Sequence, residues 1–293
     1  MAAEREGYDG MIEDSFSAIV SDLDPLVITA PTIRSGTTLL QRVLCSSSKA
    51  LIYGELCAQD LEFFLNFYAF KAQQYNCREQ EVSTALRNVL AGNVNDWIPT
   101  LMPEIPEYLR AIGRAAFAGI SYCRDHSISL DRPVWGFKHP AWNPATVRLM
   151  RTLMPRSRFI IVHRELQDCL KSAKAQSASY GAPYSKSDVE EFCRTWAENR
   201  QYLLSLQDEA TVLSLQFEDL VREPQETLAR LAKFTGVHDM DPNVLNHKVN
   251  TWTGEDYVMQ MANGYFKPAE LDDAERQIVD ATARAPTEQL QAC

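Results

Sequence analysis

The sequence lacks any apolar run long enough to cross a membrane. None of its segments approaches the roughly 20 consecutive apolar residues that a spanning helix requires. Residues 1–14 are polar and acidic, without the basic start and apolar middle of a secretory signal. We therefore expect a cytoplasmic protein with no membrane partner.

The chain also lacks an excess of positive charge. Its 29 Lys and Arg residues are outnumbered by 39 Asp and Glu residues, which gives a formal net charge of −10 at pH 7. This balance argues against a general nucleic-acid surface. An anionic ligand would need a local cationic pocket in this acidic protein. An Arg or Lys within a motif typical of phosphate binding is therefore a strong candidate for a functional residue.

Cysteine pairs and histidine clusters with metal-ligand spacing are absent. The chain has 7 Cys, and no two of them have the spacing of a zinc knuckle or a redox pair. The 5 His residues show no metal-ligand spacing either. We expect reduced thiols, mostly in the core, and no metal site.

Apolar strand-like runs alternate with segments of helical periodicity. This alternation predicts an α/β fold, with a central parallel sheet and helices on both faces. A chain of 293 residues is long enough for one such domain, so we expect a single domain over 1–293, with an N-terminal extension (1–20) and a C-terminal lid or tail (240–293). The predicted strands are 26–30, 133–138, 158–162 and 211–215. The predicted helices are 37–46, 107–124, 143–153, 166–177, 188–206 and 224–235, within a mostly helical region over 56–128 that includes an aromatic-rich segment, 61–75, expected to be core or pocket wall.

The loop 31–38 has the composition of an anion cradle. It follows the first strand and leads directly into a helix, whose first backbone N–H groups and dipole favour an anion. Gly36 allows a close backbone approach, Thr37 and Thr38 add hydroxyl donors, and Arg34 adds a fixed positive charge.

The same loop departs from the nucleotide-kinase pattern GxxxxGK followed by Ser or Thr. Pro31 replaces the first Gly, and Thr37 replaces the Lys that reaches the β- and γ-phosphates of a bound triphosphate. A metal-bound triphosphate therefore fits poorly, and a single 5′-phosphate that carries a sulfuryl group fits better. A P-loop nucleotide kinase stays open as an alternative, as does a non-catalytic nucleotide-binding protein.

Residues 32–40, Thr-Ile-Arg-Ser-Gly-Thr-Thr-Leu-Leu, resemble the PRSGTT loop of sulfotransferases that use 3′-phosphoadenosine-5′-phosphosulfate (PAPS). The Arg form is similar to tyrosylprotein sulfotransferases and their bacterial small-molecule relatives. A second signature, Arg164 with Ser172 eight positions later, matches the family's site for the 3′-phosphate. A third block, 215–220 with Pro224, resembles the family's YEDL segment, although Phe217 replaces the Tyr.

The resemblance implies a P-loop-like sulfotransferase fold, PAPS as the sulfuryl donor and PAP as the product, without a metal. It implies that the donor is held by the loop and the second signature. The residues are Arg34, Ser35, Gly36, Thr37, Thr38, Arg164 and Ser172, with Lys248 as a further candidate in the C-terminal segment.

In-line sulfuryl transfer depends on positioning and on cationic stabilisation, for which Arg34 and Lys138 are the candidates. The acceptor must also lose a proton to a general base. Glu55 matches the position of a catalytic Glu in tyrosylprotein sulfotransferases. His139 follows a Lys, as the catalytic His of cytosolic sulfotransferases does, but one residue later rather than two. Glu55 ranks slightly ahead, and His139 is the second candidate for the base or a substrate orienter.

The acceptor is expected to be a hydroxyl or amine of a small molecule, and natural-product biosynthesis is one setting for such a reaction. Asp60 and Glu62 near Glu55 would tolerate a cationic acceptor. Guanidinium alkaloids of the saxitoxin type have that chemistry. The sequence indicates no oligomeric state.

Overall fold

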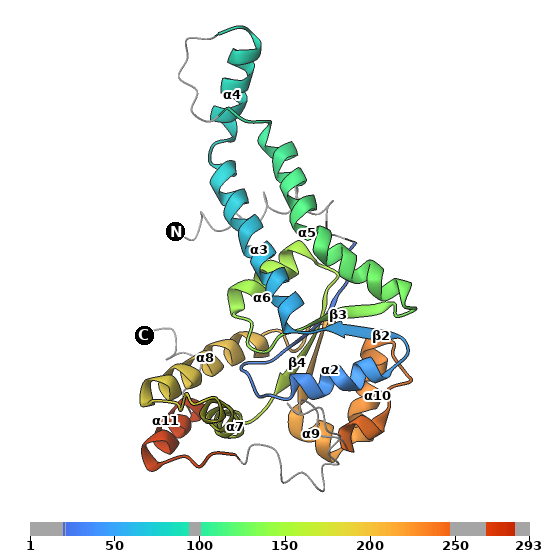
Figure 1. The fold of residues 1–293 in the computed structure, drawn as a ribbon, viewed down its shortest axis with the longest axis vertical. Helices are drawn as coiled ribbons and strands as arrows, with labels where there is room; N and C mark the ends of the chain where they lie inside the picture. The colour runs from blue at the N-terminus through green and yellow to red at the C-terminus, as the bar shows by residue number, and fades with distance from the viewer. Residues whose placement is uncertain (1–19, 21, 94–100, 247–267, 285–293) are drawn as a thin grey trace.

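A parallel sheet forms the centre of the computed structural model, which describes residues 20, 22–93, 101–246 and 268–284 (Figure 1). Its strands are β1 (Leu26–Thr29), β2 (Ala50–Tyr53), β3 (Val134–Lys138), β4 (Arg158–His163) and β5 (Val212–Gln216). They lie in the order β2-β3-β1-β4-β5, and every neighbouring pair is parallel. This confirms the predicted α/β architecture.

Helices follow the strands along the chain, as the alternation predicted. They are α2 (Thr37–Ser46), α3 (Glu55–Asn76), α4 (Glu79–Leu90), α5 (Ile105–Ser129), α6 (Pro144–Leu153), α7 (Leu166–Ser179), α8 (Lys186–Leu204), α9 (Phe217–Arg222), α10 (Pro224–Thr235) and α11 (Asp273–Arg284), with a short 3-10 helix, η1 (Pro242–Asn246). None of the helices in the described part of the chain combines the length and apolar character that a membrane crossing requires.

The two faces of the sheet are both covered by helices. Successive residues of a strand point to opposite faces. Val27 of β1 accordingly packs in a core cluster with side chains of α3, α5 and α6. Its neighbours Leu26 and Ile28 pack in a second cluster with side chains of α2 and α10. Because all of β1 is buried, its apolar run is continuous rather than alternating.

A close backbone approach joins β3 to β1. Gly136 of β3 pairs with Leu26, and a Cβ at this glycine would lie 1.8 Å from the Leu26 carbonyl oxygen. No side chain fits in that space. The glycine therefore lets β3 lie against β1, and Lys138 follows two residues later at the carboxyl end of the strand.

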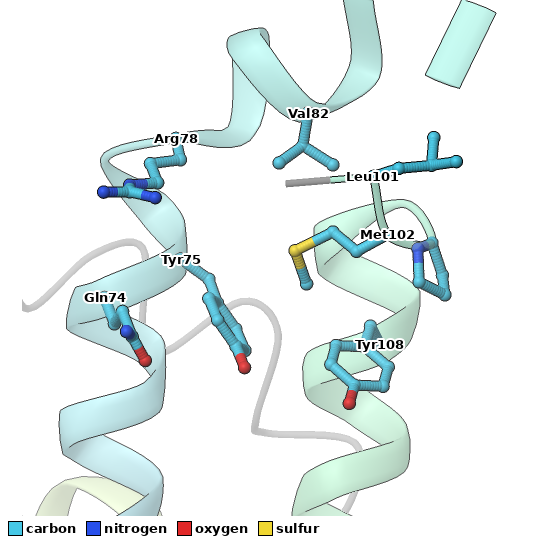
Figure 2. A pocket seen from close by; sticks show the side chains of 8 residues that line it. Gln74, Tyr75, Arg78, Val82, Leu101, Met102 and Tyr108 are labelled. Carbon is cyan, nitrogen blue, oxygen red and sulfur yellow. The ribbon is translucent and has the colours of Figure 1, made fainter. Parts of the chain in front are cut away.

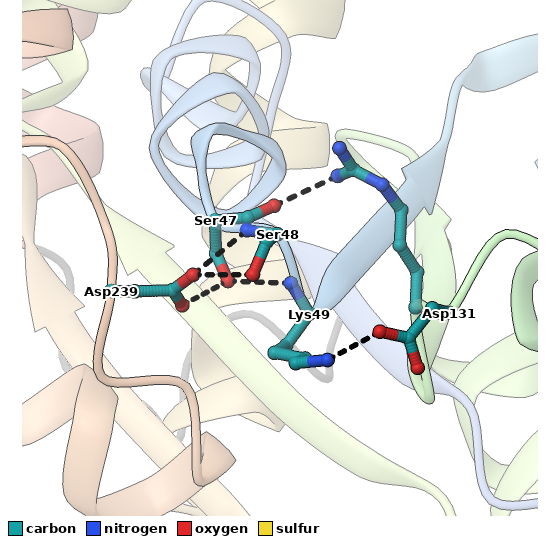
Figure 3. Close-up of polar contacts among 6 residues, drawn as sticks. Ser47, Ser48, Lys49, Asp131 and Asp239 are labelled. Carbon is teal, nitrogen blue, oxygen red and sulfur yellow. Dashed lines mark hydrogen bonds and ion pairs between the residues drawn. The ribbon is translucent and has the colours of Figure 1, made fainter.

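Polar contacts fasten the C-terminal end of α2 to the segment after α10 (Figure 3). The carboxylate of Asp239 accepts from the hydroxyl of Ser47 and, at 2.9 and 2.7 Å, from the backbone N–H and hydroxyl of Ser48. These bonds hold the pKa of Asp239 well below its usual range. Arg132 donates to main-chain carbonyls at the end of α2 and the start of β2. The helix that begins at the anion loop is thus anchored at its other end.

Helices α3, α4 and α5 extend away from the sheet as a long arm (Figure 1). The expectation that the aromatic-rich segment 61–75 is core or pocket wall holds for one side of α3 only. Tyr68 is buried and Tyr75 lines a cavity, but Phe63, Phe67 and Phe70 are exposed to solvent. The mostly helical region expected over 56–128 consists, in its described residues, of three helices, and the last of them contains the predicted helix 107–124.

Three elements of the structure were not predicted: the edge strand β2, the short helix α9, and helix α11, which packs against α7 and α8. The predicted extension 1–20 lies outside the described residues except for its last residue, and the predicted lid over 240–293 is described only in part. The single-domain boundary stays a prediction. The expectation of mostly core thiols holds for Cys169 and Cys193, which are buried, whereas Cys77 is exposed.

Candidate active site

The loop after β1 is held in place by buried hydrogen bonds. The Ser35 hydroxyl donates to the carbonyl oxygen of Thr32 at 2.8 Å, which closes the turn on itself. The side-chain amide of Asn199, a buried residue of α8, donates to the carbonyl oxygen of Pro31 at 2.9 Å. The Ser35 hydroxyl is thus engaged within the loop. Ser35 would therefore contact a ligand through its backbone N–H.

The loop delivers the chain into α2 through a left-handed turn. Gly36 is the N-cap of the helix with φ of 93°, and Arg34 also has a positive φ, 66°. The first-turn N–H groups of an α-helix have no acceptor within the helix. The backbone donors of Thr37 and Thr38 at the start of α2 therefore point out of the helix, where the dipole favours an anion.

Lys138 reaches the start of α2 from the neighbouring strand. It is the last residue of β3, and the chain continues alongside β1, where the His139 N–H donates to the Ile28 carbonyl oxygen at 3.0 Å. The Lys138 ammonium donates to the Thr38 hydroxyl at 3.2 Å and forms an ion pair with Glu55. The lysine side chain is 5% exposed, whereas that of Glu55 is 48% exposed.

Lys138 is thus nearly enclosed, and its carboxylate partner stands at the rim. The structure brings together three residues that the sequence singled out separately: a cation, a hydroxyl donor and a candidate base.

His139 lies beside this group on a buried aromatic surface. Its ring stacks on Trp142 with 5.3 Å between ring centroids and 17° between planes. Burial lowers the pKa of His139 below its usual value of 6.5, although the carboxylates of Glu62 and Glu55 oppose the shift. The imidazole is therefore neutral at pH 7 and able to accept a proton. Its Nδ1 has no hydrogen-bond partner among the described residues.

A second group of residues lies at the end of β4, the strand on the other side of β1. The Arg34 Nε donates to the Ser172 hydroxyl of α7 at 3.0 Å, and the Arg164 guanidinium donates to the Arg34 carbonyl oxygen at 2.8 Å. Arg164 also stacks on the Phe217 ring, 4.5 Å from its centroid. Its buried Nε has no hydrogen-bond partner among the described residues.

Arg34 was expected both to bind the donor and to supply a catalytic positive charge. Its side chain donates to Ser172, beside Arg164, and the catalytic role stays a prediction. Arg34 belongs to the loop and so joins the loop to the second group. Lys248 lies outside the described residues.

Two contributors were missed by reasoning from the sequence. Asn199 anchors the loop from α8, and the signal for it was a polar residue on the buried side of an amphipathic helix. Phe217 was read only as support for the fold, but its ring packs against Gly36, where a Cβ would lie 2.1 Å from the ring.

A separate cavity of about 480 Å³ lies far out on the arm, between the end of α3 and the start of α5 (Figure 2). It is lined by Gln74, Tyr75, Arg78, Val82, Leu101, Met102, Pro103 and Tyr108. None of the predicted site residues contributes to it. Within the described ranges, no three His, Cys, Asp or Glu side chains gather as metal ligands.

Comparison with known proteins places this site in a family. The model of the sulfotransferase family matches residues 25–242, well over half of the chain. Comparison with curated protein sequences gave no significant match.

Solved structures resemble the chain with low identity. The sulfotransferase domain of the Synechococcus PCC 7002 olefin synthase is 17% identical (TM-score 0.49; 90% of this chain and 96% of that one covered). The sulfotransferase domain from the curacin biosynthetic pathway is 16% identical (0.49; 90% and 99%). Retinol dehydratase, solved with androsterone and inactive cofactor PAP, is 15% identical (0.45; 93% and 84%). The family match and the parallel α/β architecture agree: the chain belongs to the sulfotransferase family.

Proposed function

We propose that this protein transfers the sulfuryl group of PAPS to a hydroxyl or amine of a small-molecule acceptor by in-line displacement, with PAP as the second product. One observation supports this most strongly. The enclosed ammonium of Lys138 contacts both the Thr38 hydroxyl at the start of α2 and the Glu55 carboxylate at the rim. A buried cation at a helix N-terminus suits an anion, and a half-exposed carboxylate suits a proton acceptor.

The residues fit a donor with two anionic ends. The N–H groups at the start of α2 and the Lys138 ammonium would hold the 5′-phosphosulfate end. Arg164, Arg34 and Ser172 would hold the 3′-phosphate. Arg164 supports this assignment, because its buried Nε has no partner among the described residues and an anion would satisfy it. Adjacent strands position both groups, because β3 and β4 flank β1.

The donor supplies an activated sulfuryl group and a leaving phosphate. Lys138 would neutralise the charge that grows on the bridging oxygen, at a place already arranged before reaction. Thr38 would keep the ammonium aligned through its hydroxyl. Glu55 would take the proton of the acceptor, and the rim position of its carboxylate leaves it accessible to a molecule arriving from solvent.

His139 is the alternative base. Its neutral ring can accept a proton, and its Nδ1 has no partner among the described residues. The ring is fixed by stacking on Trp142. We assign proton removal to Glu55, because this carboxylate contacts the catalytic lysine directly, and we assign His139 to orienting the acceptor.

We propose a cationic acceptor within the small-molecule class. The Glu55 carboxylate lies at the rim of the site. The Glu62 carboxylate accepts from the Thr146 hydroxyl at 2.9 Å and is close enough to His139 to oppose the lowering of its pKa by burial. Asp60 is exposed one turn beyond Glu55. Negative side chains around the entrance favour an amine or guanidinium compound, such as an alkaloid, over a phenol that carries a carboxylate.

Calorimetric titration of the full chain with PAP in the absence of Mg²⁺ tests the donor. We expect micromolar or tighter binding, and a loss of at least tenfold in Arg164→Ala. Arg148→Ala is the matched control, because Arg148 stacks on Tyr202, away from the loop. Binding of ATP only with Mg²⁺, and no binding of PAP, would favour a P-loop kinase instead. PAP binding without turnover of labelled PAPS, across a panel of amines, guanidines, alcohols and phenols, would favour a non-catalytic nucleotide-binding protein.

A further inference from the structure

Helix α3 carries a row of exposed apolar side chains along one side. Leu56 is 79% exposed, Phe63 66%, Phe67 37% and Phe70 59%. Their spacings of seven, four and three residues place them on one face of the helix. The rings of Phe63 and Phe67 stack with 6.4 Å between centroids and 10° between planes. We call these four residues the α3 stripe.

The stripe is distinct from the face that holds the arm to the rest of the molecule. That inner face consists of buried side chains of the same helix: Ala58, Leu61, Leu65, Tyr68 and Ala72. The stripe also belongs to a wider concentration of exposed apolar groups. Of the thirteen large hydrophobic side chains exposed among the described residues, ten lie between residues 56 and 130. Contiguous exposed apolar side chains of this kind mark an interaction surface.

The charged side chains of α3 are separated by sign along the helix. The acidic residues Glu55, Asp60 and Glu62 lie in its first eight positions, and its one basic residue, Lys71, lies in its last six. Glu55 pairs with Lys138 and Glu62 accepts from Thr146, which leaves Asp60 and Lys71 as the charges that can face a partner. Two residues of the stripe, Phe63 and Phe70, are equally far from the midpoint between residues 66 and 67. These features suit an antiparallel copy of the same helix.

We propose that the α3 stripe is a homodimer interface, in which α3 of one copy packs antiparallel against α3 of a second copy about a two-fold axis. A two-fold contact is isologous, so the same patch must suit itself. Antiparallel packing about the midpoint sets Phe63 against Phe70 of the second copy. In the same pairing, Asp60 lies opposite residue 73 of the second copy, which is two positions along the helix from Lys71.

Asp60 and Lys71 have the geometry that this pairing requires. They are eleven residues apart, about three turns of α-helix, so they lie on the same flank of the stripe. Neither forms an ion pair within the described parts of the chain. The Lys71 ammonium donates to Gln74 at 3.1 Å and lies 5.3 Å from the centroid of the Tyr75 ring. A carboxylate of a second copy can therefore approach it without breaking an existing salt bridge.

The pairing is independent of the donor site. The ion pair between Lys138 and Glu55 links the donor site to the first position of α3, well before the stripe residues Phe63, Phe67 and Phe70. In the described part of the chain, the stripe residues, Asp60 and Lys71 form no hydrogen bond or ion pair with the anion loop. A failure of the dimer proposal therefore leaves donor binding and sulfuryl transfer untouched, and the reverse also holds. The two proposals share only Asp60, so the Asp60 variant is assessed by sedimentation and not by acceptor preference.

Sedimentation equilibrium of the full chain, at micromolar concentrations and moderate salt, tests the proposal. One chain has a mass of 33.2 kDa, and we expect about twice that value. The double variant Phe63→Ser, Phe70→Ser is expected to sediment as a monomer with an unchanged circular dichroism spectrum and PAP affinity. Tyr180→Ser, an exposed tyrosine after α7, is the matched control and is expected to leave the dimer intact.

Exchanging the two charges tests whether Asp60 of one copy faces Lys71 of the second copy. Asp60→Lys and Lys71→Asp, made singly, are each expected to raise the dimer dissociation constant several-fold, because each puts like charges together across the axis. The combined variant is expected to restore most of the affinity. A monomeric wild-type chain would overturn the proposal, as would a dimer that both the phenylalanine and the charge variants leave unchanged. A monomer with protected Phe63 and Phe70 would show instead that another segment of the chain covers the stripe.

Discussion

The contact between Gly36 and Phe217 makes a prediction whose size can be worked out from the structure. Replacing Gly36 with Ala puts a Cβ 2.1 Å from one ring carbon of Phe217 and 2.5 Å from a second. The residue also has φ of 93°, a left-handed conformation that costs a residue with a side chain about 1–2 kcal/mol. The substitution therefore has a conformational cost and a steric cost.

The steric cost comes from displacing the ring. Phe217 cannot move freely, because the Arg164 guanidinium stacks on it at 4.5 Å. Overpacking of this kind costs about 1–3 kcal/mol, and loss of the stacked cation adds about 0.5–2 kcal/mol. We expect Gly36→Ala to lower the free energy of unfolding by roughly 2.5–7 kcal/mol, the sum of these three costs, and, where the protein still folds, to weaken PAP binding.

A double-mutant cycle separates the two costs. Urea unfolding of wild type, Gly36→Ala, Phe217→Ala and the double variant gives the coupling energy between the positions. With the ring removed, Gly36→Ala keeps only its conformational cost, so we expect a coupling of about 1.5–5 kcal/mol from the two costs that depend on the ring. If Gly36→Ala costs as much without the ring as with it, the packing argument is refuted and the glycine serves only the left-handed turn.

Three other predictions concern single side chains. Lys138→Met is expected to lower kcat by about 10²–10³-fold, measured with labelled PAPS, while PAP affinity changes less than tenfold; equal losses in both would mean that the lysine only binds the donor. Glu55→Gln is expected to lower kcat by roughly 10²–10⁴-fold and to do so more than His139→Asn. If His139 is the base instead, the histidine variant alone will remove an acid limb of kcat/KM below pH 6.5, because burial lowers its pKa.

The third concerns stability. Burial lowers the pKa of His163 to about 4, so between pH 6.5 and 4 the unfolded chain binds a proton that the folded protein does not. Unfolding free energy measured in urea should be fully retained above pH 6.5 and fall by at most about 3 kcal/mol toward pH 4; an equal slope in His163→Phe would contradict this.

Sequence reasoning located the elements that have local signals. The apolar run of β1, the turn residues after it and the spacing of α2 are read within about twenty residues, and the structure confirms the helix over Thr37–Ser46. The helix over Pro224–Thr235 was likewise bounded by a Pro at its start and a Gly, with φ of 79°, at its end. The four-residue strand β2 was missed, because it is short, lies at the sheet edge and is only alternately buried.

The errors concern properties that depend on tertiary contacts. Aromatic density in segment 61–75 indicated burial, yet a helix on a projecting arm has only one side against the protein. Which aromatic side chains are covered was decided by their angle around that helix. The side-chain direction of Arg34 was similarly beyond the sequence, since it depends on Ser172, 138 residues later in the chain.

In the proposed site, one side chain would link the donor to the acceptor. The Lys138 ammonium is nearly enclosed, and the Glu55 carboxylate is its ion-pair partner. An anionic donor at the start of α2 would approach the same ammonium and compete with Glu55 for it. Donor binding would then release the carboxylate toward the rim, where the acceptor arrives. Under the proposed assignment, proton removal would therefore follow donor binding and would be confined to complexes that can react.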